Sequence, residues 1–444
     1  MKISIGCGSA MAGHRLEPAI QLADSGKVDY LAFDCLAERT LALAQIRKRN
    51  DPETGYDLQL GDICRRFTPF LGRGGTIVGN FGSANPEAGA KLALQCFRES
   101  GFQDLKIGVV HGDDVLDQIL ELNVELPELG CRVRDLGDQV ISAHAYIGAE
   151  SIVTLLEQGS QFILGGRIAD PSLYVGPICH ELGWAADDWD GLAHAILAGH
   201  LLECGDHITG GNFADPPYRI VPDLHDLAYP MAEVTKDWIE VTKLPGTGGR
   251  LDAQTVKAQL AYEIHDPSRY FTPDVVADFC EVVVEDVAPD RVRVYGATAH
   301  RRPADLKIMV GLDYGWKVVG EMSFGGPGCM DRAQLAEEVI RKRAETLGGD
   351  ILDTRADLQG YNSLHDGLLQ KDNQDNPQEL RLRFAARCRT EAAAQALGQQ
   401  LEMVTYFGPA GGGGHARSIA PFIGVTPAFL PREHVNITTE VLSL

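Results

Sequence analysis

The sequence predicts an α/β protein of two domains: the first is built on a parallel sheet, and the smaller second is an α+β domain with a mainly antiparallel sheet. In the first half, short apolar runs alternate with amphipathic stretches, as in buried strands joined by crossover helices. After about residue 278, strand-like runs follow one another directly. A chain of 444 residues is also long for a single core. We therefore expect an α/β domain at 1–277, which holds the active site, and an α+β domain at 278–444.

Five apolar runs in the first domain are expected to be its parallel strands. They lie at 3–6, 28–34, 75–80, 105–111 and 161–166. The segments between them, such as 37–47 and 86–101, have the composition of helices. Crossover connections of this kind bring the carboxyl ends of parallel strands to one edge of the sheet.

The second domain is expected to contain shorter antiparallel strands and two helices. The strands are expected at 281–285, 291–295, 306–310, 316–324 and 379–385. The helices are expected at 331–347, where Asp331 can cap the first turn, and at 390–401.

Composition excludes several classes of function. Lys and Arg number 40 and Asp and Glu 62, so the net charge is −22, which argues against nucleic acid and against anionic lipid as partners. The ten cysteines form no Cys-x-x-Cys pair and are expected to be reduced thiols. We find no signal peptide and no apolar stretch near the ~18 residues that a membrane span needs. We therefore expect a cytoplasmic protein.

Polar groups and glycines follow each expected parallel strand, where open α/β sheets bind ligands. The candidates for substrate binding at these ends are Gly6, Gly8, Ser9, Asp34, Asn80, Arg167 and Asp170. The amides of residues 6–9 could hold a phosphate or carboxylate, although a tight strand-to-helix turn would have the same sequence. Arg167 could bind an anion bidentately, or it could pair with Asp170 and brace the loop.

Acid/base candidates lie in two further segments. His111 could act as a general base oriented by Asp113, or Asp113 could cap the next helix. His200 and Glu203 are spaced to share a helix face, which suits a second acid/base pair or a divalent metal. Cys204 could be a nucleophile, or a buried structural thiol.

Glycine-rich loops come later in the chain. Gly248 and Gly249 follow Gly246-Thr247 and could wrap a ligand, or form a mobile surface loop. The cofactor is unknown at this stage, and a divalent metal is one open alternative.

Several blocks in order resemble the acyclic terpene utilisation protein A family. They are Tyr30–Glu38 with Asp34 and Glu38, Gly165-Gly166-Arg167-Ile168-Ala169-Asp170, Gly199–Cys204, Thr209–Asp215, Lys243–Gly249, and Asp266-Pro267 with Tyr270–Val275. The resemblance covers most of the first ~320 residues. It implies a place in the breakdown of terpenoids or other branched acids, whose intermediates are CoA thioesters. It supplies no set of catalytic residues.

This sequence departs from the family pattern in one respect. Many members of the family carry a C-terminal ferredoxin-like domain with an Arg-Ser-Gly-Asp-Lys-Gly-type motif, and this sequence lacks that motif. This implies a two-chain branch that works with a separate small subunit.

Two functions are therefore expected as alternatives. The first is a catabolic enzyme, a lyase or hydratase acting on a small hydroxy or unsaturated carboxylic acid or its CoA thioester, with His111 and Asp113 as base and Arg167 as anchor. The second is a non-catalytic binding or regulatory large subunit that requires a small partner chain. A homo-oligomer is a further expectation.

Overall fold

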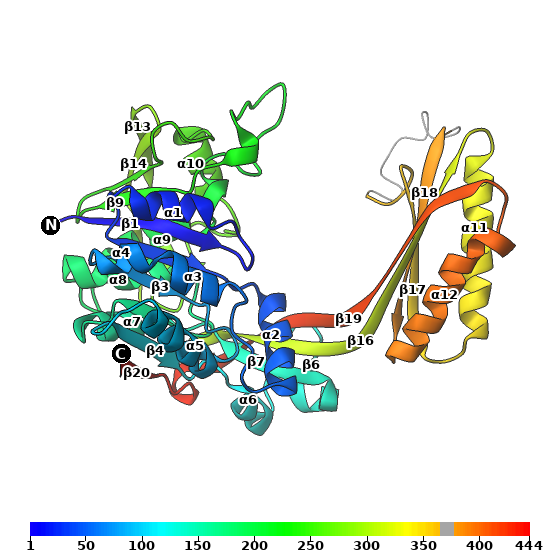
Figure 1. Ribbon diagram of the computed structural model, residues 1–444, viewed down its shortest axis with the longest axis horizontal. Coiled ribbons are helices and arrows are strands. Elements are labelled where there is room, and N and C mark those ends of the chain that lie inside the picture. The colour runs from blue at the N-terminus through cyan, green and yellow to red at the C-terminus, as the bar shows by residue number, and fades with distance from the viewer. Residues whose placement is uncertain (365–376) are drawn as a thin grey trace. The chain divides into compact units, whose positions relative to one another are not determined.

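The computed structural model describes residues 1–364 and 377–444, and the chain divides into two compact units. The first unit comprises Met1–Gly311 with Val425–Leu444, and the second comprises Leu312–Gly424. Figure 1 shows the elements of both units. The chain thus leaves the first unit once and returns to it, so the second unit is an insertion in sequence. The units are described separately below.

The first unit is built on a ten-stranded mixed sheet. Its order is β13-β14-β10-β9-β1-β2-β3-β8-β4-β20. The strands are β1 (Ile3–Ala10), β2 (Tyr30–Asp34), β3 (Thr76–Gly79), β4 (Lys106–His111), β8 (Phe162–Leu164), β9 (Met231–Val234), β10 (Ile239–Thr242), β13 (Val283–Ala288), β14 (Arg291–Tyr295) and β20 (Thr438–Ser443). The five central strands β1, β2, β3, β8 and β4 are parallel, which confirms the five runs and the α/β fold class expected from the sequence.

Helices cover both faces of this sheet. The helices of the first unit are α1 (Glu17–Asp24), α2 (Glu38–Asn50), α3 (Leu60–Arg66), α4 (Thr68–Gly72), α5 (Pro86–Glu99), α6 (Leu116–Leu122), α7 (Glu150–Glu157), α8 (Ser172–Leu182), α9 (Trp189–Glu203) and α10 (Ala253–Leu260). Apolar side chains of α1, α3, α4 and α5 share one buried core with the central strands. Helix α8 packs against β1 and β2, helix α9 packs against β1 and β9, and both helices are buried along most of their length.

The strand order creates a switch point beside β3. The chain runs from β1 through β2 to β3, passes over to β4, and then returns to place β8 between β3 and β4. The loops after β3 and β8 therefore lead to different helices, α5 and α8. Ligand sites of open α/β sheets form at such points, outside the carboxyl ends of the strands.

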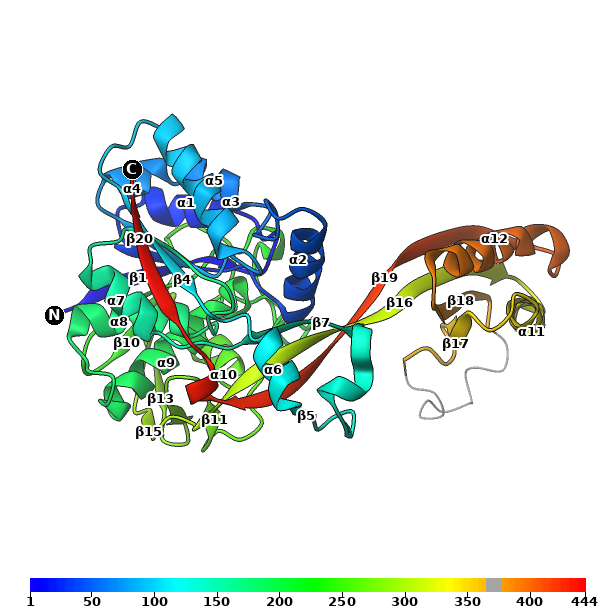
Figure 2. The ribbon, with the colours of Figure 1, turned by 90° about the horizontal axis from the view of Figure 1, so that it is seen from below.

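Smaller strands complete the first unit. They are β5 (Glu125–Leu126), β6 (Cys131–Arg132), β7 (Val140–Ala145), β11 (Tyr270–Phe271), β12 (Val276–Asp278) and β15 (Thr298–His300). Strand β7 pairs with β16, which begins at Asp305, and the Tyr146 N–H donates to the Lys307 carbonyl at 2.9 Å. At the β4 end of the ten-stranded sheet, β20 is the edge strand and runs antiparallel to β4. Figure 2 shows the two strands side by side.

The second unit has the β-α-β-β-α-β order of a ferredoxin-like fold. Its elements are β16 (Asp305–Gly325) from Leu312 onward, α11 (Cys329–Thr346), β17 (Ile351–Gln359), β18 (Glu379–Cys388), α12 (Glu391–Phe407) and β19 (Gly412–Pro431) up to Gly424. The start of β16, which includes Lys307, and the end of β19 belong to the first unit. The sheet has the order β17-β18-β16-β19, and β16–β18 and β17–β18 pair antiparallel, as expected for the smaller domain. Both helices pack on the same face through one apolar core.

The units differ from the division expected after residue 277. Strands β13 and β14 lie beyond that position, yet they extend the large sheet through β10. The last strand, β20, also belongs to the large sheet. Alternating antiparallel strands have the same pattern whichever sheet they join, so their sequence does not reveal the partner.

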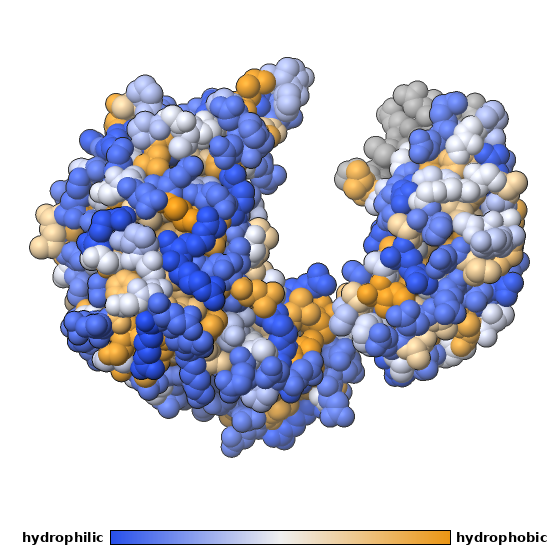
Figure 3. Space-filling model, viewed as in Figure 1, coloured by the Kyte–Doolittle hydropathy of each residue, from blue (hydrophilic) through white to orange (hydrophobic). Residues whose placement is uncertain are grey.

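The surface view in Figure 3 shows hydrophobic residues scattered among hydrophilic ones. Among the helices of the described ranges, none is long and apolar enough to cross a membrane.

Candidate active site

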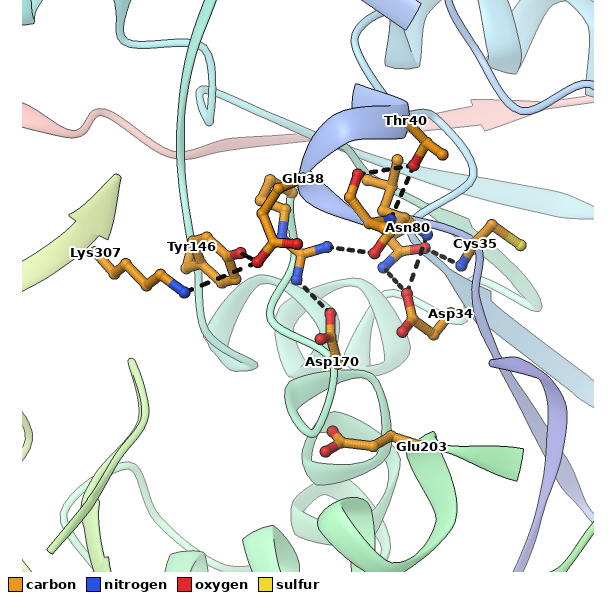
Figure 4. A network of polar contacts seen from close by, with 12 residues as sticks. Asp34, Cys35, Glu38, Thr40, Asn80, Tyr146, Asp170, Glu203 and Lys307 are labelled. Atoms are coloured by element: carbon orange, nitrogen blue, oxygen red, sulfur yellow. Dashed lines mark hydrogen bonds and ion pairs between the residues drawn. The ribbon is translucent and has the colours of Figure 1, made fainter. Parts of the chain in front are cut away.

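Side chains from three neighbouring strand ends meet at the switch point. Asn80 follows β3, and its amide donates to the Asp34 carboxylate at 2.7 Å while accepting the Cys35 N–H at 2.7 Å. Asp34 ends β2 and also accepts the Leu36 N–H. Figure 4 shows Asp170, from the loop after β8, near this pair, and Arg167 of the same loop donates to Asp170. The structure thus brings together four of the residues proposed from the sequence as substrate-binding.

Arg167 is the central cation of the site and is only 1% exposed. Its guanidinium donates to the Leu36 carbonyl at 2.9 Å and to Asp170 at 2.5 Å. The Tyr146 ring covers it, with 4.2 Å between the guanidinium carbon and the ring centroid. The sequence left open whether Arg167 binds a ligand or braces the loop through Asp170. These contacts show that Arg167 pairs with Asp170 and braces the loop. An anchor for a substrate must be reachable, and this guanidinium is enclosed by the protein.

Three residues that sequence reasoning did not propose for the site complete it. Glu38 begins α2 and accepts the Tyr146 hydroxyl hydrogen at 2.6 Å. Lys307, on β16, places its ammonium 4.6 Å from the Tyr146 ring centroid and 3.9 Å from Glu38. The side chains of Glu38 and Lys307 are 37% and 45% exposed, so a ligand can reach them from solvent.

We call the four acids Asp34, Glu38, Asp170 and Glu203 the carboxyl cluster. Asp170 accepts a hydrogen bond from Arg167, and Figure 4 shows Glu203, which ends α9, below Asp170. Four acids surround one buried arginine, so their ionisation is strongly interdependent.

The surroundings push the pKa values of these acids in opposite directions. Burial raises the pKa of Asp170, and Arg167 offsets this only in part. For Asp34 and Glu203, burial and the nearby Asp170 carboxylate hold the pKa well above its ordinary value. Burial also acts on Glu38, but the Tyr146 hydrogen bond and the Arg167 and Lys307 charges outweigh it and lower its pKa. Neighbouring acids with diverging pKa values are the usual basis of acid/base catalysis.

Glu203 and His200 form a buried neutral pair. The His200 Nε2 lies 3.3 Å from the Leu260 carbonyl, which can only accept, so Nε2 carries the hydrogen. The Nδ1, 3.1 Å from Glu203, is then an acceptor, and the glutamic acid must donate to it. Burial lowers the pKa of His200 to about 4, in keeping with a neutral ring. The other oxygen of Glu203 has no hydrogen-bond partner among the described residues.

The same pair does not have the geometry of a metal site. Both ring nitrogens of His200 face hydrogen-bond partners, so neither is free for a metal. Among residues 1–364 and 377–444 there is no group of three or more His, Cys, Asp or Glu side chains placed to hold an ion.

Asp113 has a different partner from the one expected. Its carboxylate accepts from the His144 Nδ1 at 3.0 Å and from the Arg167 backbone N–H at 2.8 Å. His111 instead faces Glu440 of β20 at 3.5 Å. The proposed His111–Asp113 pair is therefore wrong: His111 still lies within β4, and the loop that follows turns Asp113 away toward β7. The structure gives Asp113 the role of fixing the Arg167 loop.

The glycines expected to form a turn after the first strand lie within the strand. β1 continues to Ala10, so Gly6, Gly8 and Ser9 form no anion-binding loop. A Cβ on Gly8 would lie 2.4 Å from the Phe33 ring, so this position is glycine because the ring packs against its backbone. The buried Ser9 hydroxyl donates to the Met11 carbonyl.

The remaining candidates have packing roles. Burial raises the pKa of the Cys204 thiol, which disfavours the reactive thiolate that a nucleophile needs. A Cβ on Gly248 would lie 2.4 Å from the Asp226 carbonyl, and one on Gly249 would lie 2.5 Å from the Thr209 carbonyl. These glycines let two loops pack closely, and none of these contacts involves the carboxyl cluster.

Comparison with known proteins identifies the family of the chain. No curated protein and no solved structure matches the chain. The family model described as "Acyclic terpene utilisation family protein AtuA" matches residues 3–441, and that description indicates a catabolic role. Because the match covers nearly the whole chain, the protein belongs to the acyclic terpene utilisation family AtuA.

Proposed function

We propose that this protein is a catabolic lyase or hydratase, which removes or adds water beside the carbonyl group of a small hydroxy or unsaturated carboxylic acid or its CoA thioester. The observation that carries the proposal is that the pKa values of Glu38 and Asp170 are shifted in opposite directions. Both are partly exposed, with side-chain exposures of 37% and 34%, while the groups behind them are buried. The pKa of Glu38 is lowered and that of Asp170 is raised.

This divergence assigns a base and an acid. Water elimination needs a base for the proton on the carbon next to the carbonyl, and an acid for the departing hydroxyl group. Ionised Glu38 takes the carbon-bound proton, and the electrons of that C–H bond form the double bond. The C–O bond at the next carbon breaks, and the hydroxyl leaves as water with the proton from Asp170. Hydration is the reverse of these steps.

Lys307 supplies the charge that stabilises the reacting carbonyl. Proton removal places negative charge on the carbonyl oxygen, and a nearby ammonium stabilises that charge. Lys307 is the reachable cation of the site, beside Glu38 and over the Tyr146 ring. The enclosed Arg167 has a different task, because it supplies the counter-charge that keeps Asp170 from an even higher pKa.

The test is turnover with a panel of hydroxy and unsaturated acids and their CoA thioesters, followed by absorbance of the conjugated double bond. Glu38→Gln and Asp170→Asn should each lower kcat by about 10²–10⁴-fold, the usual contribution of a positioned acid or base. Glu128→Gln is the matched control, since Glu128 is exposed and makes no polar contact among the described residues. Equal turnover in all three variants would refute the assignment. Turnover that appears only when a separate small chain is added would favour the regulatory-subunit alternative.

A further inference from the structure

Both described helices of the second unit lie on one face of its sheet, and the described residues place no helix on the other face. The residues of β16 and β18 that pack under α11 and α12 are the even-numbered ones, such as Val318, Phe324 and Phe384. The odd-numbered residues therefore lie on the other face. Figure 1 shows both helices on one side of these strands.

That open face carries a pair of like charges at directly opposed positions. Lys317 of β16 is the register partner of Arg387 of β18. Like charges in this arrangement destabilise a sheet unless something neutralises them. Within the described residues, neither side chain lies within ion-pair distance of a carboxylate, whereas Arg381 and Arg383 on the same strand pair with Glu321 and Asp357.

Two aromatic rings lie beside these cations. The Lys317 ammonium is 6.0 Å from the Phe422 ring centroid, and the Arg387 guanidinium carbon is 5.8 Å from that of Tyr314. The rings are 5.8 Å apart and tilted by 60°. All four side chains are half-buried, so each keeps a surface that a ligand can contact.

A glycine sets the direction of Tyr314. Gly315 has a φ of 88°, a conformation that favours glycine, and a Cβ there would lie 2.3 Å from the Cys388 carbonyl. This break in the regular alternation brings Tyr314 to the same face as Phe422. A Cβ on Gly424 would in turn lie 2.2 Å from the Tyr314 ring, so the ring rests on bare backbone. Such irregularities often redirect a side chain toward a binding site.

We infer that this face of the second unit is a binding site for a nucleotide, with its phosphates at Lys317 and Arg387 and its base stacked on Phe422 or Tyr314. Charge complementarity identifies the phosphate, since these cations are a local exception in a chain of net charge −22. The rings identify the base, because every nucleobase offers a flat surface for stacking on an aromatic side chain. A free carboxylate or inorganic phosphate would use the cations and leave the rings exposed. The inference does not depend on the proposed reaction.

The experiment is calorimetric titration of the full chain with four probes. They are CoA, adenosine 3′,5′-bisphosphate, pantetheine (which lacks the nucleotide) and inorganic pyrophosphate. We expect the first two to bind and pantetheine not to bind. Pyrophosphate that binds as tightly as the bisphosphate, or no binding of either nucleotide, would overturn the inference.

Variants then locate the site. Lys317→Gln and Arg387→Gln should each weaken nucleotide binding roughly tenfold or more, as expected for loss of a charge-assisted hydrogen bond. Phe422→Ala or Tyr314→Ala should cost about as much if that ring stacks the base. Arg389→Gln is the control, because Arg389 follows the same strand but pairs with Asp350 and is 64% exposed. Unchanged affinity in both cation variants would place the nucleotide elsewhere and overturn the inference.

Discussion

Replacing Arg167 with methionine tests the central contact of the site. The guanidinium, in a residue 1% exposed, bonds the Leu36 carbonyl and Asp170 and lies on the Tyr146 ring. Methionine keeps much of the volume but removes the charge and both hydrogen bonds. Breaking a buried ion pair by removing one partner costs about 3–5 kcal/mol. We expect the free energy of unfolding of Arg167→Met to fall by that amount at neutral pH.

The size of this loss should depend on pH. Arg167 lowers the pKa of Asp34 and Asp170, so its removal raises both values further. A carboxyl group with a raised pKa in the folded state destabilises the protein as pH rises above its ordinary value of about 3.9, because the unfolded chain then releases a proton that the folded chain retains. The deficit of the variant should therefore be larger at pH 8 than at pH 5.

Urea unfolding followed by circular dichroism measures the loss, and hydrogen exchange locates it. Exchange should rise in β8 and leave β18 of the second unit unchanged. Arg219→Met is the control: its ion pair with Asp215 is about half exposed and should contribute only about 0–1 kcal/mol. A loss below about 1 kcal/mol for Arg167→Met, or one that does not vary with pH, would refute this account of the site.

Further predictions follow from individual contacts. In wild-type turnover, activity should fall below the lowered pKa of Glu38 and above the raised pKa of Asp170; Glu38→Gln should abolish the acidic limb of the pH profile and Asp170→Asn the alkaline limb. His111→Ala should leave turnover unchanged and stability within about 1 kcal/mol, because its contact with Glu440 is a partly exposed pair. His144→Ala should cost about 1–3 kcal/mol in thermal unfolding, because it leaves the buried Asp113 carboxylate one partner short. Gly8→Ala should cost about 1–3 kcal/mol through overpacking against Phe33, whereas Gly72→Ala, with no atom within 4 Å of its added Cβ, should not.

The parallel core and the position of the site were predictable from the sequence. Runs buried on both faces have few structural alternatives, and side chains directly after such strands must lie at one edge. Asp34, Asn80, Arg167 and Asp170 were proposed for that reason, and the structure brings them together.

The rest of the site depends on contacts between distant segments. Lys307 reaches Tyr146 because β16 pairs with β7, more than a hundred residues earlier, and its own strand has only an ordinary alternating pattern. His144 likewise becomes the partner of Asp113 through tertiary packing, whereas spacing in the sequence favours the nearer His111. The sequence also did not reveal that the glycine-rich strand β1 continues to Ala10, because Gly8 accommodates the Phe33 ring and makes no turn.

The final strand of the large sheet also determines when the first unit can be completed during synthesis. Strand β4 emerges from the ribosome early, but its antiparallel neighbour β20 is the last strand of the described chain. Until that strand arrives, the backbone N–H and C=O groups along one side of β4 have no strand to pair with, and open strand edges promote aggregation. The second unit, by contrast, is made from one continuous stretch and can fold before the first is finished. Truncations that remove β20 should therefore yield a nascent chain that depends on chaperones, even though the carboxyl cluster is encoded wholly upstream.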